Sequence, residues 1–383
     1  FAPIASIYDC SKATLSMLLT LLGWLHISAA ALYTPTMKEV RQHGACSAPF
    51  TCVSLVEVAM PRVKSGEALV AVRGSSVNPS DVDTVEGGGC VLGCGADISG
   101  VVVECNGCTR IKVGDAIWSL GEPAYAQYAA VAETILSLKP PSLNFTQAAT
   151  VPEVGLTSLL SLKRTGSLPG TPLPVGSPWT AANFSPQRLA NLTVLLTAGS
   201  GGTGAIGIEL AKAYGAKHIA TATTGAAGIA FVKDLGATFV TDYLKEDIFS
   251  ALPANSVDIV YDNYGAPFTA DKAMKVLRPG GVYLLMPHGE CFEKKTQGPP
   301  CLSANPKPGV RQLNYVTGPD FEAHGLAALD ELASLFSKGQ LSTHIDRIYA
   351  LESAANAFNY SAGPGEGGVG EHIGKIAIEI PAI

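Results

Sequence analysis

The chain has 383 residues, of which 47% are hydrophobic and 15% are charged, with 41 glycines. This length fits two domains, and the long apolar segments exclude a collagen-like or generally disordered chain. The formal net charge of −6 argues against a nucleic acid as partner, because domains that bind the phosphate backbone usually carry a basic surplus. What remains is a loop-rich globular protein, for which an enzyme is the first hypothesis.

We expect residues 1–36 to lie outside the fold. Residues 17–31 join an apolar run to small residues, and no Asp, Glu, Lys or Arg occurs between Ala13 and Thr36. With Met17 as the start, this pattern predicts a secretory signal peptide after an upstream segment, and hence the endoplasmic reticulum lumen or secretion. The alternatives are an uncleaved membrane anchor and a buried helix. Without a signal at 17–31 the protein would be cytoplasmic.

Glycan acceptors and cysteines also favour the secretory pathway. Asn-x-Ser/Thr sequences begin at Asn144, Asn183, Asn191 and Asn359. Apart from Cys10, the cysteines fall in close pairs, Cys46/Cys52, Cys90/Cys94, Cys105/Cys108 and Cys291/Cys301. An even number of cysteines in an oxidising compartment predicts disulfides, whereas in the cytosol the same residues would be free thiols.

Cys105-Asn-Gly-Cys108 has the spacing of a redox motif or of half a zinc site. Asn-Gly between apolar runs is first of all a hairpin signal. A catalytic Cys-x-x-Cys normally opens a helix, and the sequence predicts none here. We therefore expect a turn flanked by cysteines, and a thiol–disulfide enzyme with a reactive Cys105 is a third functional hypothesis.

The centre of the chain predicts a dinucleotide site. An apolar strand at 191–197 and a second strand at 218–223 flank a helical pattern at 205–214. The first strand leads directly into Gly199-Ser200-Gly201-Gly202-Thr203-Gly204. Within a βαβ unit, the first glycine permits the tight turn, the second lets the backbone approach a pyrophosphate, and the third lets helix pack on strand. The N–H groups at the helix start then meet the phosphate charge.

The end of the second strand favours NADPH over NADH. An NAD site would place a carboxylate there for the adenosine ribose. This chain has Thr223 and Thr224 instead, whose hydroxyls can donate to a 2′-phosphate, although the following residues 226–228 contain no Arg or Lys. Further strands at 237–241, 257–261 and 282–286 continue the parallel pattern, and their carboxyl ends make Asn263, Tyr264 and His288 candidate ligand-lining residues.

Both flanks of this unit carry motifs in a recognisable order. They are residues 37–41, 65–72, Val77-Asn78-Pro79-Ser80-Asp81, 95–102, 112–115, 124–128, 339–341 and 374–378. On these motifs the chain resembles the medium-chain dehydrogenase/reductase superfamily, in its zinc-free quinone oxidoreductase branch.

The resemblance implies an α/β fold in which a Rossmann domain is inserted in a GroES-like, mostly β catalytic domain. The implied divisions are 37–164 and 323–383 for the catalytic domain, 191–322 for the NADP-binding domain, and a Pro/Gly/Ser-rich insertion at 165–190, for which a neutral loop is the default. Members of this family usually pair, which makes a homodimer an expectation.

The resemblance also implies that no zinc is bound. Zinc-dependent relatives place a Cys and a His where this chain has Asn78 and Ala96. Catalytic zinc needs three protein ligands, so the loss of two leaves no site. The stretch from Asp115 to Tyr128 is also too short for the structural zinc lobe of those relatives.

Without a metal, the resemblance implies an NADPH-dependent hydride transfer to a quinone or an α,β-unsaturated carbonyl, because the negative charge then develops on a distant oxygen. It places Asn78 at the nicotinamide ribose or the substrate oxygen, and Tyr243 and Asn263 near the adenosine and nicotinamide. Tyr125 is either a cleft donor or a packed structural residue. No Tyr occurs in residues 84–90, which argues against the specialised enoyl-thioester reductases. The alternative function is a non-catalytic nucleotide-binding or interaction protein with the same fold.

Overall fold

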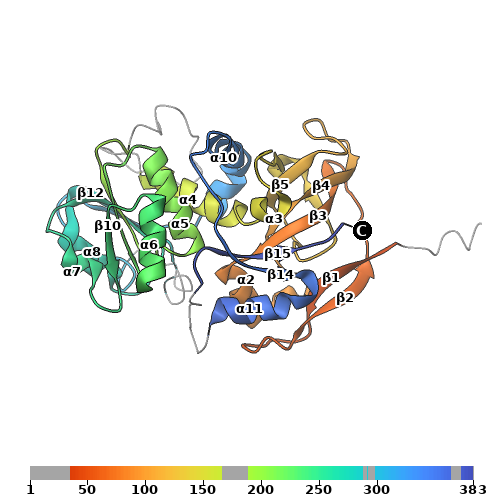
Figure 1. Ribbon diagram of the computed structural model, residues 1–383, viewed down its shortest axis with the longest axis horizontal. Coiled ribbons are helices and arrows are strands. Elements are labelled where there is room, and N and C mark those ends of the chain that lie inside the picture. The colour runs from red at the N-terminus through yellow and green to blue at the C-terminus, as the bar shows by residue number, and fades with distance from the viewer. Residues whose placement is uncertain (1–34, 166–188, 288–290, 292–297, 364–371, 383) are drawn as a thin grey trace, which may run out of the picture.

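The computed structural model describes residues 35–165, 189–287, 291, 298–363 and 372–382. The expected signal peptide at 17–31, nearly all of the insertion at 165–190, Asn183 and His288 lie outside the described residues. Within the described ranges, the chain forms two large sheets with the long helix α4 (Pro152–Thr165) between them (Figure 1). This confirms the predicted α/β class, a Rossmann unit inserted in a GroES-like domain.

The mostly β half is built from both ends of the chain. Its seven-stranded sheet has the order β14-β15-β3-β4-β5-β7, and β6 pairs with β3. The strands are β3 (Glu67–Val77), β4 (Asp97–Asn106), β5 (Ala116–Leu120), β6 (Tyr128–Ala132), β7 (Ser137–Leu138), β14 (Ile345–Ala350) and β15 (Lys375–Glu379). β15 runs antiparallel to β3 with Ile376 opposite Val77, so the end of the chain completes the sheet that its beginning started (Figure 1).

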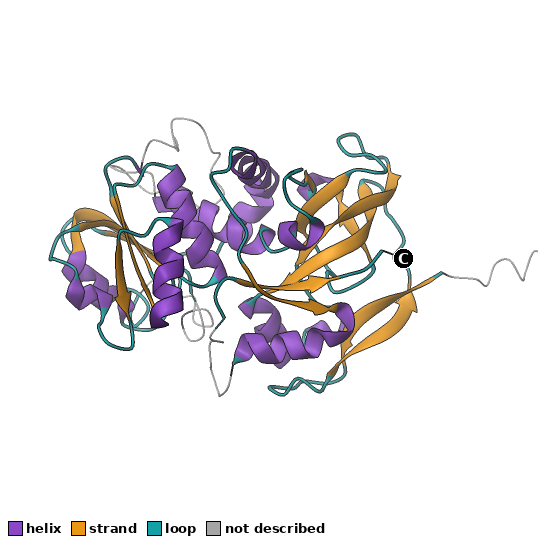
Figure 2. Cartoon of the chain, viewed as in Figure 1, coloured by secondary structure: helices purple, strands orange, loops and turns teal. Residues whose placement is uncertain are grey.

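Smaller elements surround this sheet (Figure 2). β1 (Thr36–Gln42) and β2 (Val53–Ala59) form a separate antiparallel ribbon. The helices are α2 (Pro79–Glu86), α3 (Phe145–Ala148) and α11 (Ala354–Ala362), with 3₁₀ turns η1 (Cys90–Leu92), η2 (Glu133–Ile135) and η4 (Leu351–Ser353). Pro79 follows Asn78 at the start of α2, where its missing N–H costs no helical hydrogen bond.

The nucleotide half is a six-stranded parallel sheet in the order β10-β9-β8-β11-β12-β13. Its strands are β8 (Thr193–Leu196), β9 (His218–Thr223), β10 (Phe239–Asp242), β11 (Val257–Asp262), β12 (Leu277–Leu285) and β13 (Arg311–Asn314). Its helices are α5 (Gly202–Ala213), α6 (Gly225–Leu235), α7 (Ile248–Ala251), α8 (Thr269–Val276) and α10 (Gly318–Ser337). All six residues of β11 are buried, as expected for a central parallel strand covered on both faces.

α4 packs the two halves together. Leu159 and Leu160 of this helix are fully buried in a core that also holds Leu332 of α10 and Ile206 of α5. Trp118 of the mostly β sheet joins the same core and meets the Phe336 ring edge-on at 5.9 Å. The start of α4 is thereby held at the junction of the halves.

Local details differ from expectation at three places. The turn flanked by cysteines does join two antiparallel strands, β4 and β5, but β5 begins only at Ala116, so the connection is a longer loop rather than a two-residue hairpin. Asn191 is exposed with φ 68° and precedes its strand instead of opening it. The strand expected at 282–286 starts earlier, as β12, because Leu277 already pairs with Val257 of β11.

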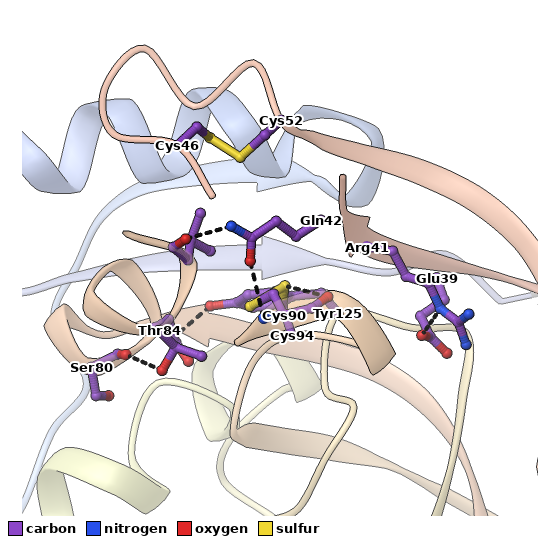
Figure 3. The surroundings of a disulfide bond; sticks show 12 residues. Glu39, Arg41, Gln42, Cys46, Cys52, Ser80, Thr84, Cys90, Cys94 and Tyr125 are labelled. Carbon is purple, nitrogen blue, oxygen red and sulfur yellow. Dashed lines mark hydrogen bonds and ion pairs between the residues drawn. A yellow bond between two sulfur atoms is a disulfide. The ribbon is translucent and has the colours of Figure 1, made fainter. Parts of the chain in front are cut away.

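All eight described cysteines are paired as disulfides, in the pairs Cys46–Cys52, Cys90–Cys94, Cys105–Cys108 and Cys291–Cys301. Cys90–Cys94 lies inside the protein close to Tyr125 (Figure 3). The Cys94 carbonyl accepts from the Tyr125 N–H at 2.9 Å, so the stapled loop holds the backbone of this tyrosine. No described helix is long and apolar enough to cross a membrane.

Candidate active site at the junction of the two halves

The glycine-rich loop joins β8 to α5, as predicted, and each glycine meets a different demand. A Cβ on Gly199 would lie 2.2 Å from the Thr221 hydroxyl, and one on Gly204 would lie 2.1 Å from the Ala198 carbonyl oxygen. Both glycines are therefore required by the packing of strand and helix. A Cβ on Gly201 would meet only the Ala198 oxygen at an ordinary 3.5 Å. The surrounding protein atoms therefore do not require glycine at this position. The space beside its Cα is open to a ligand.

The residues predicted to select the cofactor already have partners inside the protein. The Thr223 hydroxyl donates to Ser200 Oγ at 2.7 Å, and the Thr224 hydroxyl donates to Asp242 Oδ1 at 3.1 Å. Lys245 Nζ lies 2.9 Å from Asp242 Oδ2, and this interaction holds the pKa of the Asp242 carboxyl below its usual value. Tyr243 follows with 57% of its side chain exposed at the sheet edge.

Sequence reasoning missed Asp242 as a member of this group. It searched for a carboxylate at the end of β9, whereas Asp242 ends the neighbouring strand β10, directly opposite Thr223 in the register. The parallel pairing of two adjacent βα units was the signal that could have found it. Asp242 and Lys245 therefore belong to the surroundings of the predicted ribose.

Asn263 follows β11 and keeps one polar atom free. Its Nδ2 donates to the Thr197 carbonyl at 3.2 Å, while its buried Oδ1 has no hydrogen-bond partner among the described residues. The preceding Asp262 accepts from Thr197 and Tyr283 and is fully buried, which raises the pKa of its carboxyl. An orphaned buried acceptor is costly unless a ligand donates to it, so Asn263 fits the side of a bound nucleotide. Tyr264 is exposed beside it.

Asn78 is held at the start of α2 by groups from two other elements and by Asp81 of α2 itself. Its Nδ2 donates to Asp97 Oδ2 of β4 at 2.8 Å, and its Oδ1 accepts from the ammonium of Lys375 on β15. Its backbone N–H donates to Asp81 Oδ2 at 2.8 Å. Both ends of the amide are therefore oriented by charged, buried neighbours.

Lys375 connects this amide to the glycine-rich loop. Its methylenes lie against Gly202, where an added Cβ would come within 2.7 Å of Lys375 Cδ. Gly374 donates from its N–H to the Ser200 carbonyl at 2.8 Å. Between α4, α5 and these residues lies a small pocket, lined by Val154, Gly202 and Lys375 among others. Lys375 therefore contacts both the nucleotide loop and Asn78.

Tyr125 is fully buried and its hydroxyl points inward. It donates to Asp81 Oδ2 at 2.8 Å and also lies 3.0 Å from the Ser76 carbonyl oxygen. Burial, and then the Asp81 charge, raise the pKa of this phenol well above its usual value. Its ring packs on Phe358 and closes against Gly95, where a Cβ would lie 2.8 Å from the ring. This position makes Tyr125 a positioning partner of Asp81, so its predicted role as a direct donor in the cleft is not taken further.

Two carboxyls at this junction carry raised pKa values. Burial raises the pKa of Asp81 to about 6. Glu153, the second residue of α4, has its pKa raised to about 8 by burial and by the negative charges of Asp81 and Asp97. No motif marks Glu153 in the sequence, because it is a single acidic residue in an apolar helix.

Ala96 lies next to Asp97 and offers no ligand atom in its side chain. No group of three or more His, Cys, Asp or Glu side chains that could hold a metal ion occurs in the part of the chain that the structure describes.

Comparisons with known proteins agree with this architecture. Residues 64–141 match the family described as the alcohol dehydrogenase GroES-like domain, and residues 235–378 match the family described as zinc-binding dehydrogenase. The chain is 32% identical over 242 residues to an NADPH-dependent alkenal/one oxidoreductase, chloroplastic, of Arabidopsis thaliana, covering 58% of this chain and 56% of that protein, a little over half its length. It is 29% identical to a 2-methylene-furan-3-one reductase of Solanum lycopersicum, covering 73% of this chain and 70% of that one.

Solved structures share the fold. The quinone oxidoreductase from Coxiella burnetii superposes with a TM-score of 0.71 at 24% identity, covering 91% of this chain and all of the other. The Escherichia coli quinone oxidoreductase complexed with NADPH gives 0.69 at 20% identity, covering 90% of this chain and all of the other.

The fold, with its glycine-rich loop between β8 and α5, is that of a dehydrogenase/reductase. The chain belongs to the medium-chain dehydrogenase/reductase superfamily, in its quinone oxidoreductase-like branch.

Proposed function

We propose that this protein is an NADPH-dependent oxidoreductase that transfers a hydride to a quinone or an α,β-unsaturated carbonyl. The observation that carries the proposal is Lys375, whose stem lies on the nucleotide loop at Gly202 while its ammonium holds Asn78 in the cleft. A nicotinamide extending from that loop would reach the Asn78 side of the junction. The relatives named for alkenal/one and furanone reduction support the substrate class.

The residues present fit a dinucleotide. The α5 N–H groups from Gly202 onwards supply positive dipole ends for the diphosphate, Gly201 leaves its side open, and Asn263 Oδ1 offers a free acceptor. When bound, the nicotinamide supplies the hydride. The protein orients the two partners and excludes water from the junction.

NADPH is the proposed coenzyme rather than NADH. Thr223 and Thr224 lie at the end of β9, and Lys245 is within 2.9 Å of Asp242. Lys245 neutralises the Asp242 carboxylate. It also brings a positive charge to the place where a 2′-phosphate would bind. This supplies the cation that residues 226–228 lack.

We further propose that the reaction uses no zinc. Asn78 and Ala96 replace the ligands of the zinc-dependent relatives, and Asn78 has both ends of its amide bound to Asp97 and Lys375. Conjugate addition needs less polarisation of the carbonyl than direct addition does, because the charge spreads to a distant oxygen. Hydrogen-bond donors and water then suffice.

Purified protein tests these proposals. It should bind NADPH in a calorimetric titration and oxidise it with members of a quinone and enone panel, at the same rate before and after treatment with a chelator. Loss of activity on chelation would overturn zinc independence alone. Binding without turnover across the panel would favour the non-catalytic alternative, and failure to bind either NADPH or NADH would overturn the proposed enzyme.

The secretory location also remains a proposal. The four disulfides support it, because such bonds persist in oxidising compartments. The exposed Asn144 is an accessible glycan acceptor, whereas several relatives are named as chloroplastic or mitochondrial proteins. Mass analysis of protein from its native cells would report the mature N-terminus, the thiol count and the glycans, and light scattering would test the expected homodimer.

A further inference from the structure

The backbone of Glu153 is held in place at the junction of the two halves. It is the second residue of α4, and its N–H donates to Asp97 Oδ1 at 2.8 Å, so the helix start is anchored to the same carboxylate that orients Asn78. Its side chain reaches towards α2, where the Ser80 hydroxyl donates to Glu153 Oε1 at 2.6 Å. Glu153 Oε2 makes no hydrogen bond to any described residue, which leaves it available to a substrate.

The surrounding charges favour a proton on Glu153. Two carboxyls face it, Asp81 from α2 and Asp97 from β4, and one ammonium, Lys375 from β15. Lys375 is already engaged, because its Nζ donates to Asn78 Oδ1 and to the Val77 carbonyl and lies 3.8 Å from Asp97 Oδ2. Burial beside two acids, with the Lys375 ammonium turned to other groups, raises the pKa of Glu153 to about 8.

The other acidic groups at this junction are less accessible. Asp81, Asp97 and Tyr125 are all buried, and the Tyr125 hydroxyl donates inward to Asp81. Glu153 is only partly buried, and the exposed Ser80 connects its carboxyl to solvent. It is therefore the acid of this cluster that can both meet a substrate and be recharged with a proton from water.

We propose that Glu153 is the general acid that completes the reduction by protonating the substrate after hydride addition. This inference rests on the proposed function. Hydride from NADPH forms a C–H bond at the β-carbon of the enone, the carbon–carbon π electrons move to give an enolate, and NADP⁺ remains. The Glu153 O–H bond then breaks, its proton goes to the enolate oxygen or α-carbon, and the carboxylate takes a new proton from water beside Ser80.

The test compares wild-type protein with E153Q and with E86Q. The glutamine keeps an oxygen that can accept from Ser80 but has no acidic proton, and Glu86 is an exposed glutamate on α2 outside the cluster. With an enone, kcat of the wild type should fall as pH rises above about 8, because the carboxyl loses its proton. E153Q should lose about 10²–10⁴-fold in kcat, the usual contribution of a general acid. E86Q should match the wild type.

Two readouts do not depend on turnover. Calorimetry should give E153Q the same NADPH affinity as the wild type, within about twofold, because the carboxyl lies on the substrate side. Infrared difference spectra should show a protonated carboxyl that titrates between pH 7 and 9 in the wild type and is missing in E153Q. That titration uses wild-type protein, so it decides the matter even if E153Q does not fold.

The outcomes separate the two proposals. If the wild type is active and E153Q is equally active, the role of Glu153 is overturned and the proposed reductase function stands. The same holds if the active wild type shows no carboxyl that titrates above pH 7. A wild type that binds NADPH but reduces no enone or quinone overturns the proposed function, and the role of Glu153 falls with it. An E153Q that loses NADPH binding assigns the residue to the fold or cofactor site instead.

Discussion

The glycine-rich loop and the carboxyl–amide cluster differ in how they are encoded. The loop lies within one continuous βα unit, and two of its glycines are required by contacts of 2.1 and 2.2 Å that a Cβ would make. The cluster draws Asn78, Asp97, Glu153 and Lys375 from four elements far apart in the chain. A site within one βα unit can be recognised in the sequence as a motif. A site whose residues are far apart in the chain forms only when the two halves pack together.

The largest expected effect is the loss of the cation in the cluster. K375M removes the donor to Asn78 Oδ1 and the Val77 carbonyl and leaves Asp97 without its nearby positive charge. Breaking a buried ionic arrangement on one side costs about 3–5 kcal/mol, so the free energy of unfolding should fall by that amount in urea denaturation. K217M, at an exposed lysine of the nucleotide half, is the control. Equal stability of the two variants would show that the cluster is not held by Lys375.

Two glycine variants should separate the effect of the loop on stability from its effect on NADPH binding. G204A forces a Cβ onto the Ala198 carbonyl and should lower the free energy of unfolding by about 1–3 kcal/mol, as overpacking does. G201A meets only an ordinary contact, so its unfolding should match the wild type while its NADPH affinity falls by about tenfold, equivalent to about 1.4 kcal/mol. Unchanged NADPH affinity in G201A would place the diphosphate elsewhere.

The cluster should also give the protein a pH-dependent stability. The folded pKa values of Asp81 and Glu153, about 6 and about 8, both exceed their ordinary values, so the protonated forms favour the folded state. Their contribution is complete below about pH 4 and is lost as pH rises through 6 and then 8. Denaturation at stepped pH should show E153Q lacking the decline between pH 6 and 8 that the wild type has. The same decline in both proteins would assign it to another group.

The smallest effect is expected at the ribose. K245A leaves Asp242 unneutralised and removes a charge from the proposed 2′-phosphate position. Because Lys245 is exposed, the preference for NADPH over NADH should fall by only about two- to fivefold, measured as the ratio of the two dissociation constants. K338A, at another exposed lysine, serves as control, and an unchanged ratio in K245A would show that Lys245 does not select the coenzyme.

These contrasts explain what the sequence could and could not predict. The order of strands, the glycine-rich loop and Asn78 followed from local patterns and from motifs in a known order. Tyr125 was visible as a motif residue, but its burial against Asp81 depends on the fold of the Cys90–Cys94 loop. Glu153 could not be singled out, because a lone carboxylate acquires its role only from neighbours on other elements. Asp242 could have been found only by pairing β10 with β9, which places it opposite Thr223.

Hydride transfer across the junction is the central claim, and an isotope tests it most directly. Enzyme, an enone and NADPH deuterated at nicotinamide C4 would be incubated together, and the product analysed by mass spectrometry and NMR. Our account predicts a saturated ketone or aldehyde with deuterium at the β-carbon. Deuterium on the carbonyl carbon of an alcohol product, or none in any product despite bound NADPH, would contradict it.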